Sequence, residues 1–213
     1  MQQPMRLILG LACTSAVCGA TVYDNGAPDY LSGVEMTRWL QADDFYISAN
    51  THINSATFSL LATGLDSWDG TIEWFIFDAP NGNGGNPGDL LASGNAQSIA
   101  MDPVGIGDYY DVQFDFGQDV QVEAQRRYFF GLHMASDYDS SDGLYWGTTS
   151  DVNPDHIPHS VSSFQGTQDN WFNSANSGFP TDLSFTLVPA PSTLGLLALS
   201  TLVSARRRRD PLI

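Results

Sequence analysis

Residues Tyr110-Asp111-Val112-Gln113-Phe114-Asp115-Phe116 alternate without interruption between apolar and polar side chains. Successive side chains of a β-strand point to opposite faces, so this spacing predicts a strand with one buried face. Residues 71–77 start with the same alternation and end as a continuous apolar run, and residues 128–134 are similar. Such runs are typical of strands that are covered on both faces.

Further segments with strand character recur at short intervals along the chain. They are residues 42–47, 53–61, 90–98, 109–116, 143–147 and 183–188. Turn-forming pairs such as Asp69-Gly70 and Asp142-Gly143 separate them. Many short strands with such turns predict an all-β fold, an antiparallel two-sheet sandwich of jelly-roll-like type that occupies residues 21–187 as one domain. We expect a signal helix before it and a short hydrophobic helix after it.

The first 20 residues have the organisation of a secretory signal peptide. One positive charge, Arg6, precedes an apolar stretch from Leu7 to Val17, and small residues end at Ala20. Lipidation at Cys13 or Cys18 is the alternative. Both cysteines lie in this segment, so a mature domain that begins at Thr21 contains no thiol and no disulfide.

The last 26 residues have three parts. A proline motif covers residues 188–193, an apolar segment covers 194–205, and an arginine cluster covers 206–209. The apolar segment can enter a bilayer, and the arginines favour the cytoplasmic side. A spanning helix needs about 20 apolar residues. The twelve residues of 194–205 are short for a permanent span, although an ordinary C-terminal transmembrane anchor remains the alternative.

This tail resembles the PEP-CTERM sorting signal of bacterial proteins. The matching residues are Val188, Pro189, Ala190, Pro191, Arg206, Arg207, Arg208 and Arg209. Ala190 stands where that signal has glutamate. The resemblance implies an exosortase-type sorting enzyme as a partner, export across the inner membrane, and transient membrane anchoring before delivery to the cell surface or the medium. Segments such as Trp68-Asp69-Gly70-Thr71 and Asp169-Asn170-Trp171-Phe172 are similar to a domain type found in PEP-CTERM proteins. This second resemblance implies a secreted β-sandwich and assigns no catalytic residue.

The body of the protein is strongly acidic. Residues 21–187 contain three arginines, no lysine and 23 acidic residues, which gives a net charge of −20. Such a surface repels nucleic acid and anionic lipid, so nucleic-acid binding is excluded as a function class.

No motif for catalysis emerges. The sequence has no Gly-x-Ser-x-Gly elbow, and the isolated His133 lies in an apolar strand where a buried, hydrogen-bonded role is expected. With so many carboxylates, the presence of acidic pairs points to no glycosidase site. We therefore predict that the protein is not an enzyme.

Two kinds of binding site are candidates. Asp137, Asp139 and Asp142 lie close together in a turn and offer the hard oxygen ligands that calcium prefers. The alternative for these aspartates is a solvated acidic turn. Trp39, Trp146 and Trp171 lie at predicted strand ends or in loops, where indole rings could stack on sugars, and the alternative is core packing.

Together these features predict an exported, non-enzymatic protein of the cell surface or extracellular matrix, sorted through its C-terminal signal. The alternative is a glycan-binding module, assisted by calcium, that acts on exopolysaccharide.

Overall fold

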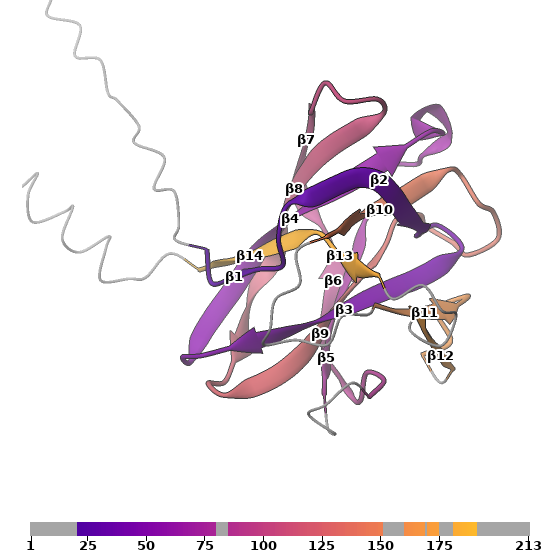
Figure 1. Cartoon of the computed structure of the whole chain (residues 1–213). Coiled ribbons are helices and arrows are strands. Elements are labelled where there is room, and N and C mark those ends of the chain that lie inside the picture. The colour runs from indigo at the N-terminus through magenta and orange to yellow at the C-terminus, as the bar shows by residue number, and fades with distance from the viewer. Residues whose placement is uncertain (1–20, 80–84, 151–159, 169, 175–180, 191–213) are drawn as a thin grey trace, which may run out of the picture.

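In the residues that the structure describes, fourteen strands form two antiparallel sheets that pack face to face (Figure 1), which confirms the predicted all-β sandwich. The computed structural model describes residues 21–79, 85–150, 160–168, 170–174 and 181–190. The predicted signal helix and hydrophobic helix lie outside these residues. One short 3-10 helix, Leu65–Ser67, precedes β5. No helix in the described ranges has the length and apolar character needed to cross a membrane.

The first sheet is built around β4 (Thr51–Ala62). β8 (Tyr109–Val122) pairs along one side of β4, and β14 (Phe185–Pro189) and β10 (Leu144–Thr149) pair along the other. Four further strands extend this sheet: β1 (Tyr23–Asp24) beside β14, β2 (Pro28–Glu35) and β13 (Asp182–Leu183) beside β10, and β7 (Gln97–Pro103) beside β8.

The second sheet has six strands in one row. Their order is β12 (Trp171–Asn173), β11 (Val161–Phe164), β3 (Trp39–Ile47), β9 (Arg126–His133), β5 (Glu73–Asp78) and β6 (Leu90–Asn95). The single strand expected over residues 90–98 is therefore two strands, β6 in this sheet and β7 in the other.

The main core lies between the sheets and is rich in aromatic rings. The predicted alternation in β8 is confirmed, because Val112, Phe114 and Phe116 are buried and the residues between them are exposed. The Trp74 ring stacks on Phe116 with 4.5 Å between ring centroids. Burial of such large rings makes a large contribution to the apolar area that drives folding.

A second apolar cluster covers the outer face of the second sheet. It contains Leu40, Ala42, Phe75, Phe77, Phe129 and Val161. Because neighbouring residues in β5 and β9 point to opposite faces, these strands contribute to both cores. The prediction that residues 71–77 and 128–134 are covered on both faces is confirmed.

The two ends of the described chain lie side by side. Val22 N–H donates to the carbonyl of Leu187 at 2.9 Å, and Tyr23 pairs with Leu187. β14 continues to Pro189, two residues past the predicted domain boundary, and the described chain ends at Ala190. In Figure 1 this β1–β14 corner lies on the opposite side of the molecule from β11 and β12.

Candidate functional site: an aromatic groove at one edge of the second sheet

The groove begins with a pair of rings on neighbouring strands. Trp39 is the first residue of β3 and Phe164 is the last residue of β11, and the two are directly paired. Their ring centroids are 4.8 Å apart and the ring planes are tilted by 58°. The Arg38 guanidinium lies over the Phe164 ring, 4.9 Å from its centroid, and helps to hold this ring in place.

The edge strand β12 adds a third ring. Trp171 and Phe172 are adjacent in this strand and therefore point to opposite faces. Phe172 approaches Trp39 edge to face, with 5.7 Å between centroids. It remains 59% exposed, and it is the one aromatic ring among the large apolar side chains that are exposed in the described chain.

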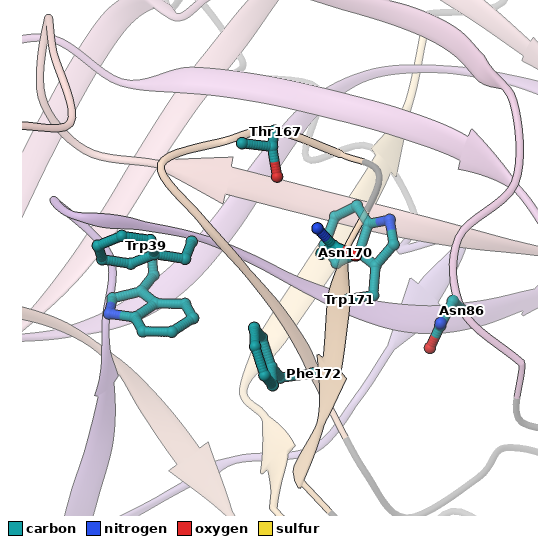
Figure 2. Close-up of a pocket in the computed structure, with 7 residues that line it drawn as sticks. Trp39, Asn86, Thr167, Asn170, Trp171 and Phe172 are labelled. Atoms are coloured by element: carbon teal, nitrogen blue, oxygen red, sulfur yellow. The ribbon is translucent and has the colours of Figure 1, made fainter.

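These rings line a hollow of about 600 Å³, which we call the first hollow. Its lining also includes amide and hydroxyl groups, and the described residues that line it are Trp39, Asn86, Phe164, Thr167, Asn170, Trp171 and Phe172. Figure 2 shows Trp39 and Phe172 approaching from two strands, with Thr167 and Asn170 around the same space. The volume lies within the range of small-molecule sites, about 300–1,000 Å³.

A second hollow of about 450 Å³ adjoins the first. It is lined by Val34, Glu35, Trp39, Gln41, Ser162, Phe172, Asn173, Ser174 and Thr181. Trp39 and Phe172 line both hollows, so the two spaces meet at this aromatic pair.

A second layer of side chains supports the groove from behind. Gln165 and Gly166 both adopt positive φ angles, 54° and 60°, in the turn that follows β11. Gly166 lies so close to Tyr138 that a Cβ atom there would be 2.5 Å from the tyrosine hydroxyl. Tyr138 in turn stacks on the buried His133, with 3.6 Å between centroids.

His133 has the satisfied, buried role that its apolar strand predicted. Its Nε2 atom lies 2.7 Å from the carbonyl oxygen of Thr37, and its Nδ1 atom lies 3.1 Å from Oε2 of Glu73. The imidazole is fully buried and holds loop residues to the sheet.

Of the three tryptophans predicted to bind glycan, two meet in the groove. Trp39 and Trp171 both line the first hollow, and Trp171 also packs edge to face on Phe77 at 5.4 Å. Trp146 lies elsewhere, fully buried in the main core, where its Nε1–H donates to the carbonyl of Ser184 at 2.9 Å. The expectation that Trp146 lies where its ring could stack on a sugar is therefore wrong. β10 is flanked by β4 and β2, and the Trp146 ring faces the main core.

Sequence reasoning missed Phe164 and Phe172. One signal for Phe172 was available. Alternation in a strand places Phe172 and Trp171 on opposite faces, so the two rings cannot both pack against the same side of the sheet. Phe164 gave no such signal, because its pairing with Trp39 joins residues far apart in the chain.

The three aspartates predicted to bind calcium form a hydrogen-bonded turn. Asp139 N–H donates to Oδ1 of Asp137 at 3.0 Å, and the Ser140 hydroxyl donates to Oδ1 of Asp142 at 3.0 Å. Among the residues that the structure describes, no group of three or more His, Cys, Asp or Glu side chains is placed to hold a metal ion. The structure therefore does not assemble Asp137, Asp139 and Asp142 into a calcium site.

A buried acidic group lies between the two sheets. Burial, together with the charges of Asp182 and Asp44, raises the pKa of Asp43 well above its usual range. Burial and the charge of Asp44 raise the pKa of Asp182 to about 7. Asp44 itself pairs with Arg127 on the outer face of the second sheet. These contacts are structural, since the groups bridge strands and line neither hollow.

The start of the predicted sorting motif belongs to the sandwich. Val188 and Pro189 are the last residues of β14, and Ala190 N–H donates to the carbonyl of His52 at 2.8 Å. Pro191 and Arg206–Arg209 lie outside the described residues. The strand ends at the first proline, as expected for a residue that cannot donate to a sheet.

Comparisons with family models, curated proteins and solved structures found no match to this chain.

Proposed function

We propose that the chain is an exported, non-enzymatic protein of the cell surface or extracellular matrix, sorted by an exosortase-type enzyme that acts on its C-terminal tail. The observation that carries this proposal is the order of the tail: a proline motif, an apolar segment, and then the cluster Arg206–Arg209. A signal peptide at residues 1–20 and a body with a charge of −20 support export to an aqueous compartment.

The arrangement of the termini is compatible with processing at both ends. β1 pairs with β14, so both terminal segments connect to one corner of the sandwich. Removal of residues 1–20 and of the segment from Pro191 onward leaves intact every strand of the part of the chain that the structure describes.

Mass spectrometry of the exported protein tests this function. We expect a mature species that begins at Thr21 and lacks Arg206–Arg209. An exported species that retains these arginines would contradict processing and leave simple anchoring, and a protein that stays in the cytosol would contradict export.

The sharpest variant is Pro191→Ala, because Pro191 follows β14 whereas Pro189 is part of that strand. We expect Pro191→Ala to accumulate in unprocessed form. Pro211→Ala, beyond the arginine cluster, is the matched control and should be processed normally.

The groove favours glycan binding as a second function of the same protein. Sugars present apolar C–H faces that pack on aromatic rings and hydroxyls that bond to amides, and the first hollow combines both kinds of group. Affinity electrophoresis of the full chain through gels that contain neutral or anionic polysaccharide tests this function. Retardation by at least one polysaccharide is expected, and unretarded migration in all of them would contradict it.

A further inference from the structure

We propose that the two hollows are adjoining subsites for one uncharged glycan chain, which crosses the Trp39–Phe172 pair. This inference rests on the glycan-binding function proposed above and specifies its ligand. The structural basis is that both rings line both hollows, so a ligand that fills one space and continues into the other must pass over them.

The exposure of Phe172 points to a ligand. A phenylalanine that is 59% exposed contributes little to folding, because most of its apolar area stays in water. Its ring is nevertheless held edge to face against Trp39, which is fixed by Phe164 and Arg38. The result is a rigid apolar platform with amide and hydroxyl groups on both sides, which suits a pyranose ring better than a flexible apolar peptide.

The few charges around the groove favour an uncharged sugar. The Arg38 guanidinium is engaged over the Phe164 ring, 4.9 Å from its centroid. Among the residues that the structure describes, the seven side chains that line the first hollow are all uncharged. In the second hollow the one charged side chain of the described lining is Glu35, and its carboxylate accepts hydrogen bonds from the backbone N–H groups of Thr37 and Arg38 at 2.9 and 3.1 Å. The surrounding body carries a charge of −20, which repels polymers of uronic acids.

The size of the site predicts dependence on chain length. A single sugar occupies one hollow only, whereas a chain of several units extends through both hollows and packs on both shared rings, Trp39 and Phe172. Affinity should therefore rise with the number of units and level off once both hollows are filled.

Isothermal titration calorimetry of the full chain with glucose oligomers tests this inference. The probes are β-1,3-linked and β-1,4-linked series of one to six units, with polygalacturonate as the anionic polymer. We expect at least a tenfold gain in affinity between one and four units in one series, and no binding of polygalacturonate.

The variant Phe172→Ala removes one of the two rings that both hollows share. We expect it to lose about tenfold or more in affinity for the longest oligomer, since truncation of a central aromatic anchor typically has this effect or a larger one. The variant Leu91→Ala is the matched control: Leu91 is 51% exposed and lies on β6, at the opposite edge of the same sheet. It should bind as the unmodified protein does.

Thermal unfolding of both variants is measured in parallel, and an unchanged Tm assigns the loss to the ring rather than to the fold. If Phe172→Ala unfolds early, Asn170→Ala provides the second test, with an expected severalfold loss.

The outcomes separate this inference from the function on which it rests. Absence of binding to every saccharide would overturn both. Binding that does not depend on chain length, or that survives Phe172→Ala, would overturn the two-subsite arrangement alone. A preference for polygalacturonate would overturn the uncharged ligand.

Discussion

Asp43 on β3 accepts a hydrogen bond from the backbone N–H of Leu183 on β13, with 2.7 Å between the two atoms, and so joins the two sheets of the sandwich. The same carboxylate oxygen accepts from Nδ2 of Asn25 at 3.2 Å, and Asn25 also donates to the carbonyl of Leu183 at 2.8 Å. Polar groups that cross a core in this way fix how the layers are positioned, because each buried donor requires its acceptor.

The variant Asp43→Ala tests this link. It removes the acceptor for the buried N–H of Leu183 and for Asn25, and each donor left without a partner costs about 1–3 kcal/mol. We expect the free energy of unfolding to fall by about that amount or more, measured by urea denaturation. An unchanged midpoint would show that the sheets are held together by apolar packing alone.

Stability should decrease as the pH rises from about 4 to above 7. The folded-state pKa of Asp43 is raised and that of Asp182 is about 7, so the folded protein binds more protons than the unfolded chain in this range. The resulting stabilisation is fully present below the unfolded pKa, near 4, and is lost as the pH passes the folded values. Urea midpoints at pH 5 and pH 8 measure the effect.

Asp182→Asn is the control for this pH dependence. It removes one of the two shifted groups and leaves most of the surface charge, so its stability should vary less between pH 5 and pH 8. An equally steep profile in this variant would assign the effect to general repulsion among the acidic side chains.

Two adjacent arginines should differ sharply in their effect on stability. The Arg127 side chain is only 14% exposed and pairs with the buried Asp44. Arg127→Ala leaves that carboxylate without its guanidinium and should cost about 3–5 kcal/mol. Arg126 pairs with Glu123 and Asp78 in the solvent-exposed layer, so Arg126→Ala should leave the urea midpoint nearly unchanged. Equal losses in the two variants would contradict this distinction.

Trp146 should matter for folding and not for ligand binding. Trp146→Phe removes the donor to the carbonyl of Ser184 and leaves part of a fully buried space empty. The expected cost is about 1–3 kcal/mol, with unchanged affinity for glucose oligomers. Calorimetric unfolding and titration of the same sample check both halves, and a loss of affinity with intact stability would contradict the assignment of Trp146 to the core.

The turn behind the groove offers a further test. Gly166 has φ = 60°, and an added Cβ would collide with the Tyr138 ring. Gly166→Ala should therefore cost about 1–2 kcal/mol or more through backbone strain alone, and should displace the adjacent Thr167 from the first hollow. Gly105 is the control: its φ is 81° with open space around it, so Gly105→Ala carries the strain without the collision and should leave the groove intact.

The strands were predictable where the local sequence shows the side-chain alternation or the apolar run of a strand. In β8 and β9, side-chain alternation and apolar runs are local properties, and all eight expected segments contain strands. β2 was missed because Pro28, Gly33 and two acidic residues dilute its strand character. The division of residues 90–98 between the sheets was missed because β6 ends at Asn95 and β7 begins at Gln97, so the break falls on the single residue Ala96, and alanine is not a turn signal.

The site was predictable only in part, for a physical reason. Trp39 and Trp171 are conspicuous as residue types, but the groove depends on β11 lying between β3 and β12. That pairing joins Trp39 to Phe164 across the sequence and leaves Phe172 at the edge of the sheet. Long-range pairing is not encoded in any local pattern, so neither phenylalanine could be assigned from its neighbours.

The position of β14 determines how the molecule would bear mechanical tension. This strand leads into the tail and lies between β1 and β4, on the side of the molecule away from the groove (Figure 1). A pull between a tethered tail and a polymer held at the groove would load β14 along its length. The hydrogen bonds from β14 to β1 and β4 would then resist the force together, in shear, rather than break one after another.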